Sequence, residues 1–313
     1  MALEKLEMRE IYTTTLMELA EKNERIVLLD ADLMKASKTL AFKAKFPDRT
    51  VDVGVAEANM IGVAAGLAAS GKIPFTHTFT PFATRRCFDQ VTISVAYSKL
   101  GVKMMGSDPG VSAELNGGTH MSFEDVGLMR NLPGMTIFEP VDGNQLRQAL
   151  PYIVEHTGPV YIRMFRKQAE SIFDESYKFT WLKGDLLKNG NDLTIIATGI
   201  MVKEALTACE MLREEGIMAR VINIHTVKPI DAELIIKAAK ETGAIVTVEN
   251  HNIINGLGSA VAEVLVENYP VPMKRIGVRD HFGEVGMMPF LMEKFHMLPV
   301  DIVAACKEVY NRK

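Results

Sequence analysis

The stretch GVAEANMIGVAAGLAASG, residues 54–71, places one acidic residue, Glu57, between an apolar strand pattern and a run of small residues. The alternating residues Val51, Val53 and Val55 predict a buried strand, and the alanines and glycines after them predict a closely packed helix. We therefore expect Glu57 at a strand-to-helix turn. A carboxylate there either interacts with the positive helix N-terminus or is a catalytic acid whose pKa is raised by burial. The local pattern leaves both interpretations open.

The composition describes a soluble globular protein with more than one core. A chain of 313 residues exceeds the usual size of a single hydrophobic core, so we expect two domains. With 48% hydrophobic residues, 24% charged residues and a net charge of -4, it has no positive field for nucleic acid or an anionic membrane. Its three scattered cysteines form neither a disulfide framework nor a zinc pattern, which favours a reducing cytoplasm. We recognise no membrane span or targeting segment.

Short apolar segments alternate with helical patterns along the chain, which predicts an α/β fold with mostly parallel sheets flanked by helices. The periodicity is lost between two such regions. We therefore expect a first domain at 1–170, a linker at 171–190 and a smaller domain at 191–313. Helices are expected at 8–22, 35–46, 57–70 and 143–154, and strands at 25–29, 51–55, 102–105, 135–138, 160–163, 192–199, 219–224, 244–249 and 274–278.

Polar residues follow several of the predicted strands. Asp32, Glu57, the His77 to Phe79 segment and the loop 106–120 all come directly after one. Because ligands bind beyond the carboxyl ends of parallel strands, we expect these residues to share one edge of the first sheet.

Five further motifs carry a resemblance to a known family. They are THTFTPF at 76–82, NGGTH at 116–120, VENH at 248–251, GLGS at 256–259 and FGE at 282–284. Together with the opening stretch, they make the chain similar to the pyrimidine-binding and C-terminal domains of transketolases over essentially its whole length. The first third to half of an ordinary transketolase has no counterpart here. The chain thus resembles the C-terminal subunit of a split, two-chain transketolase.

The resemblance implies transfer of a two-carbon ketol unit from a ketose phosphate to an aldose phosphate, with thiamine diphosphate as cofactor. Glu57 matches the glutamate that hydrogen-bonds a pyrimidine ring nitrogen of that cofactor and shares a proton with it. Glu57 is therefore the expected catalytic acid and base, and its apolar surroundings should favour the protonated form.

The resemblance also implies contacts to the rest of the pyrimidine. Phe79 and Phe82 would line the pocket, with Phe82 stacking on the ring. At Arg85 the family often carries a tyrosine, so the third aromatic residue of the set is missing. The expected cofactor-binding residues are Asp32, Leu33, Glu57, Phe79, Phe82 and Arg85.

For the substrate, the resemblance implies a second set of residues. His120 matches a histidine that contacts hydroxyls next to the reacting carbonyl, and we expect it to be catalytic with Glu57. Asn116 stands where the motif more often has aspartate. Arginine suits the distal phosphate because its guanidinium forms paired hydrogen bonds with oxyanions, and Arg166 is the best-aligned candidate. The expected substrate-binding residues are Arg9, Ser37, Asn116, His120 and Arg166.

We expect no metal ligands in this chain. Thiamine diphosphate enzymes hold the diphosphate through a divalent metal at a Gly-Asp-Gly motif, and the nearest string here is Gly184-Asp185-Leu186. Glu249 and His251 lack a recognisable metal-site spacing, and the resemblance implies a structural second domain. A separate N-terminal subunit would then bind the diphosphate and Mg²⁺, in an assembly of two copies of each chain.

Two alternatives remain open. The β subunit of a 2-oxo acid dehydrogenase component has the same two-domain layout and a separate partner, and residues 88–90, Phe-Asp-Gln, resemble it. A regulatory or scaffolding chain without activity is the other. His120 and the arginines favour a sugar phosphate enzyme over the first alternative, and the presence of Glu57, His120 and Phe82 argues against the second.

Overall fold

The computed structural model describes residues 3–313, which form two compact units. One unit holds the described residues up to Pro109 together with Leu128–Trp181, and the other holds Gly110–Gly127 together with Leu182–Lys313. The change of unit after Trp181 falls inside the predicted linker. Residues 110–127, which the prediction assigns to the first domain, pack instead with the second unit. The first two residues of the predicted first domain lie outside the described residues.

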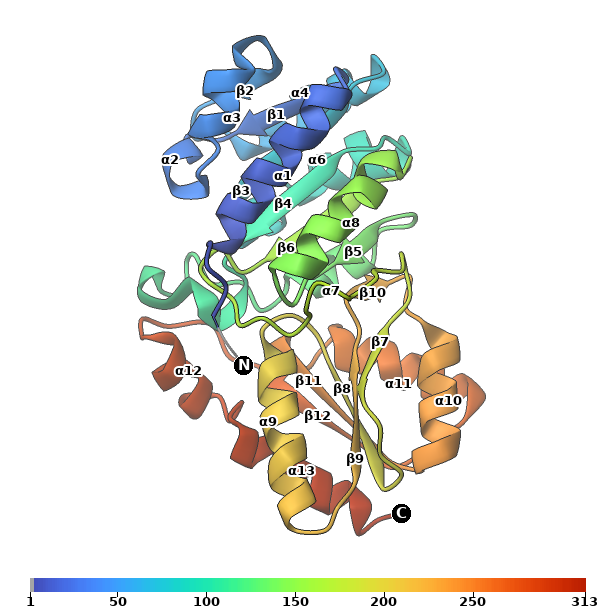
Figure 1. Ribbon diagram of the computed structural model, residues 1–313. Coiled ribbons are helices and arrows are strands. Elements are labelled where there is room, and N and C mark those ends of the chain that lie inside the picture. Colours follow the sequence, from blue (N-terminus) through green and yellow to red (C-terminus); the bar gives the residue numbers. More distant parts are fainter. Residues whose placement is uncertain (1–2) are drawn as a thin grey trace. The chain divides into compact units, whose positions relative to one another are not determined.

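The first unit contains a parallel sheet with the strand order β5-β6-β4-β3-β1-β2, flanked by helices (Figure 1). This confirms the α/β prediction. The strands are β1 (Ile26–Asp30), β2 (Thr50–Asp52), β3 (Ile73–Phe79), β4 (Lys103–Ser107), β5 (Thr136–Phe138) and β6 (Val160–Met164). The helices are α1 (Met8–Lys22), α2 (Met34–Ser37), α3 (Leu40–Lys45), α4 (Glu57–Ala69), α5 (Thr80–Ala83), α6 (Phe88–Gln90) and α8 (Gly143–Glu155), with a π-helix η3 (Val91–Tyr97) and short 3-10 turns η1 (Pro47–Arg49) and η2 (Arg85–Cys87). Helix α7 (Asp125–Arg130) contains the junction between the two units.

Helices α1 and α8 bury one side of this sheet (Figure 1). Their apolar side chains recur at helical spacing and join strand side chains in one core, including Ile11, Leu16, Leu28, Phe75, Leu146, Leu150 and Ile162. Full burial of each such side chain stabilises the fold by roughly 1.5–3 kcal/mol before entropy is counted. This core supports the strand ends that carry the polar residues.

The strand before Glu57 is shorter and more exposed than predicted. β2 covers only Thr50–Asp52, lies at the sheet edge and pairs with β1. Val55 is 73% exposed, because an edge strand has a neighbour on one side only and Gly54 turns the chain at a φ of 70°. The prediction of a buried 51–55 strand is therefore wrong in extent and burial.

Helix α4 has two different faces. Ala64 and Ala65 are buried, which confirms close packing of the alanine face. Gly62 and Gly66 are exposed, and a Cβ added to either would meet no atom within 4 Å. The positions of Gly62 and Gly66 are therefore open within residues 3–313.

The predicted helix 35–46 is two helices, α2 and α3. Lys38 between them has a φ of 64°, which no continuous helix allows. The hydroxyls of Ser37 and Thr39 on either side both donate to Asp30. These side-chain bonds draw the chain out of helical geometry.

The second unit contains a sheet with the order β12-β11-β8-β9-β7. Helices α9 and α13 pack together, as do α10 and α11, on opposite sides of the sheet (Figure 1). The strands are β7 (Asp185–Lys188), β8 (Leu193–Ala197), β9 (Ala219–Asn223), β11 (Ile245–Asn252) and β12 (Met273–Val278), with a short β10 (Thr226–Lys228). The helices are α9 (Met201–Glu214), α10 (Ala232–Thr242), α11 (Leu257–Asn268), α12 (Met288–Lys294) and α13 (Pro299–Tyr310), with a 3-10 segment η4 (Gly110–Asn116).

Strand β7 lies inside the predicted linker. It pairs antiparallel with β9 at the sheet edge, and its residues alternate between half-buried and exposed. Four residues, of which two are half-buried, are too few for a recognisable period, so the sequence pattern did not predict this strand.

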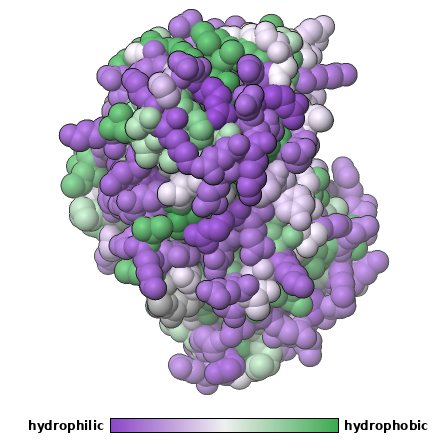
Figure 2. All heavy atoms as spheres, turned by 45° about the horizontal axis from the view of Figure 1, so that its top comes forward, coloured by the Kyte–Doolittle hydropathy of each residue, from purple (hydrophilic) through white to green (hydrophobic). Residues whose placement is uncertain are grey.

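The surface of the molecule is mixed in character. Within residues 3–313, no helix has both the length and the apolar character needed to span a membrane. Figure 2 shows a mostly hydrophilic face with hydrophobic patches between the polar side chains. Exposed apolar side chains include Val55, Ile93, Tyr97 and Phe282, while the three cysteines are free and buried.

Candidate active site

Polar and aromatic residues gather at the carboxyl edge of the first sheet. Asp30 of β1 pairs in register with His77 of β3, and Phe79 of β3 pairs with Ser107 of β4. Arg166 follows the end of β6, which is next to β4. Neighbouring parallel strands therefore bring these residues to one edge, which agrees with the prediction for His77–Phe79. Residues 110–120 of the predicted loop belong to the second unit instead.

Glu57 begins α4 and is only 3% exposed. The Arg86 Nη1 donates to both of its carboxylate oxygens, at 2.9 and 3.0 Å. The buried charge is thus compensated by a cation, which corrects the expectation of a purely apolar pocket. Arg86 was not among the predicted residues. The sequence signal that could have indicated Arg86 was its position four residues after Phe82, a spacing that brings two side chains together in helical turns.

The aromatic residues complete this arrangement. The rings of Phe79 and Phe82 meet edge to face with centroids 6.2 Å apart. The Arg86 Cζ lies 3.7 Å from the Phe82 ring centroid, so the planar cation stacks on Phe82 while it hydrogen-bonds Glu57. A flat nitrogen heterocycle in place of that guanidinium would find the same two partners. Glu57 and Phe82 therefore fit a pyrimidine ring.

Arg9 and Arg166 lie together, each with a carboxylate partner. The Arg9 backbone N–H donates to the Arg166 carbonyl at 3.2 Å. The Arg166 Nε lies 2.5 Å from Asp108 Oδ2, and the Arg9 Nη2 lies 2.7 Å from a Glu7 oxygen. Burial raises the pKa of Asp108 to about 6, although Arg166 acts to lower it. The Arg166 guanidinium also lies over Phe79, with Cζ 5.1 Å from the ring centroid, which connects the arginines to the aromatic pair.

Ser37 and Leu33 belong to a network around Asp30. The Ser37 hydroxyl is buried and donates to Asp30 at 3.2 Å, and the Leu33 N–H donates to the same carboxylate at 2.6 Å. Asp32 is exposed and has a φ of 62°. These residues shape the loop after β1, and their contacts to cofactor or substrate stay predictions.

His77 is a buried residue of this region to which the sequence analysis assigned no role. It is 1% exposed, and the ring of Tyr12 meets it edge to face at 5.7 Å. Burial, together with the nearby Arg166 and Arg9, lowers the pKa of His77 to about 3. No hydrogen-bond partner for its Nδ1 occurs among the described residues. His77 is therefore neutral and adds no further charge beside the arginines.

The remaining predicted residues lie elsewhere. Arg85 is exposed in η2. Asn116 is exposed at the end of η4, and His120 is half-buried with its Nδ1 2.9 Å from the Thr119 Oγ1. Both belong to the second unit. Across residues 3–313, no group of three His, Cys, Asp or Glu side chains is arranged to hold a metal ion.

The Asp30 carboxyl makes one pH dependence testable. Burial raises the pKa of Asp30 from 3.8 to about 6, against the hydrogen bonds that lower it. Between these values the folded state holds a proton that the unfolded state has released. The stability contributed by this group is therefore present below pH 3.8 and is lost as the pH rises through about 6.

We expect Asp30→Asn to reduce that fall in the free energy of unfolding. Relative to wild type, the variant should gain stability between about pH 4 and 6 and show a constant difference above that range. Denaturant titrations at several pH values measure it, with the exposed Asp48→Asn as the matched control. If the free energy of unfolding of Asp30→Asn falls with pH as steeply as that of wild type, other groups cause the pH dependence.

Comparisons with known proteins follow the same two-part division. The family descriptions "transketolase, pyrimidine binding domain" and "transketolase, C-terminal domain" match residues 4–171 and 182–302. The first match ends at residue 171, where the predicted linker begins, and the second begins at residue 182, where the second unit resumes.

Individual relatives match over nearly the whole chain. The chain is 60% identical over 306 residues to the 6-deoxy-6-sulfo-D-fructose transketolase subunit SqwH of a Clostridium species, covering 98% of this chain and 95% of that one. It is 41% identical over 274 residues to one of the subunits of the apulose-4-phosphate transketolase of Phocaeicola vulgatus, covering 87% of each. A solved structure described as a split-gene transketolase, an inactive β4 tetramer, superposes with a TM-score of 0.91 at 45% identity, covering 98% of this chain and 99% of that chain.

Proposed function

The chain belongs to the transketolase family, and from that premise we propose that it is the C-terminal subunit of a split, two-chain transketolase. It transfers a two-carbon ketol unit from a ketose to an aldose, and it shares thiamine diphosphate with a separate N-terminal subunit. The observation that carries this proposal is the buried Glu57, which holds a planar cation stacked on Phe82. Relatives named as single subunits support the split, because this chain spans nearly all of their length.

In this proposal Glu57 holds and moves a proton at the pyrimidine ring nitrogen. When bound, thiamine diphosphate supplies the nucleophilic carbon that accepts the two-carbon unit. Phe82 stacks on the ring, and Phe79 closes its edge. Arg86 compensates the Glu57 charge in the cofactor-free chain, which lets a carboxylate stay buried there until the ring replaces the guanidinium.

The partner subunit would hold the diphosphate and Mg²⁺. Hard oxygen ligands suit a Mg²⁺ ion between phosphates, and the chain has no Gly-Asp-Gly motif to supply them. The cofactor would then lie between two chains, each of which supplies half of its contacts. Such an enzyme is active only as an assembly.

We propose that the substrate carries an anion at the end distant from its carbonyl. Arg9 and Arg166 would bind it, and His120 and Asn116 would contact its hydroxyls. Because Glu7 and Asp108 partly neutralise the two arginines, a sulfonate with one charge fits them at least as well as a more highly charged phosphate ester. The name of the relative with 60% identity points to a sulfonated ketose, and that of the relative with 41% identity points to a sugar phosphate.

Two surfaces of the first unit support self-association in a 2+2 assembly. The glycine face of α4 is open, and Val55, Ile93 and Tyr97 expose more than half of their area. Apolar surface of this kind marks an interaction site more often than an ordinary exposed region. A cytoplasmic location accords with three buried, free cysteines.

Cofactor binding tests the split site. We expect the isolated chain to bind thiamine diphosphate and Mg²⁺ at least about 100-fold more weakly than the complex with its N-terminal partner, because one chain offers half of the contacts. Titration calorimetry on both samples measures the difference, and light scattering gives the stoichiometry. Ketol transfer is then assayed with sulfonated, phosphorylated and uncharged ketoses. Tight, Mg²⁺-dependent binding by the isolated chain would contradict the proposal.

A further inference from the structure

Three consecutive residues at the carboxyl end of β11, Asn250, His251 and Asn252, contact the segment 110–127 that carries Asn116 and His120. Asn250 and His251 are each 1% exposed. The proposed function gives neither side chain a role. Their hydrogen bonds to the segment 110–127 indicate what that role is.

Asn250 holds the start of the segment. The Val111 N–H donates to the Asn250 Oδ1 at 2.9 Å, and both residues are buried. Gly110 just before has a φ of 55°, and a Cβ there would overlap the side-chain and backbone oxygens of Asn250. Without this acceptor the buried Val111 N–H would lose its hydrogen bond, so Asn250 determines where the segment begins.

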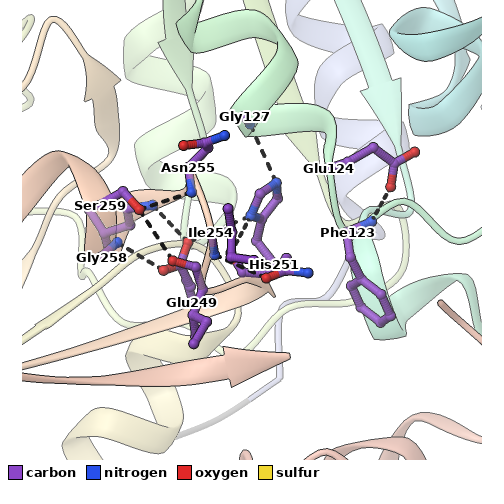
Figure 3. A network of polar contacts seen from close by, with 12 residues as sticks. Phe123, Glu124, Gly127, Glu249, His251, Ile254, Asn255, Gly258 and Ser259 are labelled. Carbon is purple, nitrogen blue, oxygen red and sulfur yellow. Dashed lines mark hydrogen bonds and ion pairs between the residues drawn. The ribbon is translucent and has the colours of Figure 1, made fainter. Parts of the chain in front are cut away.

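His251 and its neighbour hold the end of the segment (Figure 3). The Asn252 N–H donates to the Phe123 carbonyl at 3.0 Å, and the Gly127 N–H donates to the His251 Nε2 at 3.4 Å. The His251 Nδ1 lies 2.6 Å from the Asn252 carbonyl oxygen. Because a carbonyl only accepts, Nδ1 carries the proton and Nε2 offers its lone pair to Gly127.

The strand end that makes these contacts is itself anchored. The two Glu249 carboxylate oxygens accept hydrogen bonds from the Leu257 and Gly258 N–H groups at 2.7 and 2.8 Å (Figure 3). These are the first residues of α11, where a negative charge is favoured. A Cβ on Gly256 would overlap Glu249, so the helix start lies directly against the strand. The contacts therefore come from a strand end that is hydrogen-bonded to the start of α11.

The middle of the segment also packs on the second unit. A Cβ on Gly118 would overlap the Gly283 carbonyl oxygen. The rings of Phe123 and Phe295 meet edge to face at 5.4 Å. His120 lies between these two contacts, so the segment is supported on both sides of it.

We propose that Asn250 and His251 are positioning residues that set where Asn116 and His120 meet the sugar. The second domain would then take part in substrate recognition instead of being structural only. This inference rests on the proposed function, in which His120 contacts the substrate.

Amide hydrogen exchange on the isolated chain tests the contacts without needing activity. Asn250→Ala should speed exchange of the Val111 amide by about 10-fold, and His251→Ala should do the same for Gly127, each sparing the other end. His251→Gln keeps an acceptor near the Nε2 position and should restore Gly127 protection. His225→Ala is the matched control, a buried histidine of the same unit that pairs with Thr226.

Kinetics of the two-chain complex test the positioning role. Asn250→Ala and His251→Ala should raise KM for the ketose by about 10-fold and leave thiamine diphosphate affinity unchanged, with recovery in His251→Gln. Unchanged exchange in 110–127 would overturn the inference, and so would faster exchange with an unchanged KM. A wild-type complex without ketol transfer would instead contradict the proposed function, while the exchange data still decide whether the contacts hold the segment.

Discussion

Replacing Glu57 by glutamine should slow hydrogen–deuterium exchange at the C2 carbon of thiamine diphosphate by roughly 10²–10⁴-fold in the reconstituted complex. Glutamine keeps the shape and can still accept a hydrogen bond from Arg86, but it cannot exchange a proton with the ring nitrogen. Glu57→Ala should be about as slow. The complex should assemble and bind cofactor in both variants.

The structure changes the expected effect on stability. In an apolar pocket, removal of the Glu57 charge would stabilise the fold. Glu57 is paired with Arg86, however, and the Arg86 side chain is 44% exposed and can be hydrated when the pair is lost. We therefore expect a change of no more than about 1 kcal/mol in the free energy of unfolding. C2 exchange at the wild-type rate in Glu57→Gln would show that Glu57 only compensates the helix end and Arg86.

Arg166→Ala should raise KM for ketoses with a charged end by about 30-fold, equivalent to about 2 kcal/mol for a lost charge-assisted pair. The same measurement with uncharged ketoses is the control, and cofactor affinity should not change. Arg166→Lys keeps the charge without the planar fork and should give an intermediate KM. Comparing the rise in KM for phosphorylated and for sulfonated ketoses shows which anion depends more on Arg166.

Removing Arg166 also leaves its partner unpaired. Asp108 is 2% exposed and lies 2.5 Å from the Arg166 Nε. A buried carboxylate without its cation is destabilising, so the double variant Asp108→Asn with Arg166→Ala separates fold damage from lost binding. An equal loss for charged and uncharged ketoses in both variants would make Arg166 a structural residue.

The separate helices and strands were largely predictable. The alternation of helices with strands, the helix that begins at Glu57 and the short strand before Asp30 follow from local periodicity, which side-chain spacing in a helix or strand imposes. The observed α1 and α4 end within a residue of their predicted ranges. The exceptions are elements that depend on contacts between residues outside the local pattern. Helices α2 and α3 are separate because the hydroxyls of Ser37 and Thr39 hydrogen-bond Asp30. Strand β7 depends on pairing with β9.

Residue types at short, regular spacings were enough to predict the fold class, the family resemblance and the placement of Glu57 at the start of a helix. Only the tertiary structure paired Glu57 with Arg86, gave Arg166 and Arg9 their carboxylate partners, and attached the segment 110–127 to Asn250 and His251. Asn250 is 139 residues from Val111 in the chain. Such contacts depend on how strands and loops far apart in sequence pack around a shared core, and a local residue pattern does not predict which distant residues will meet.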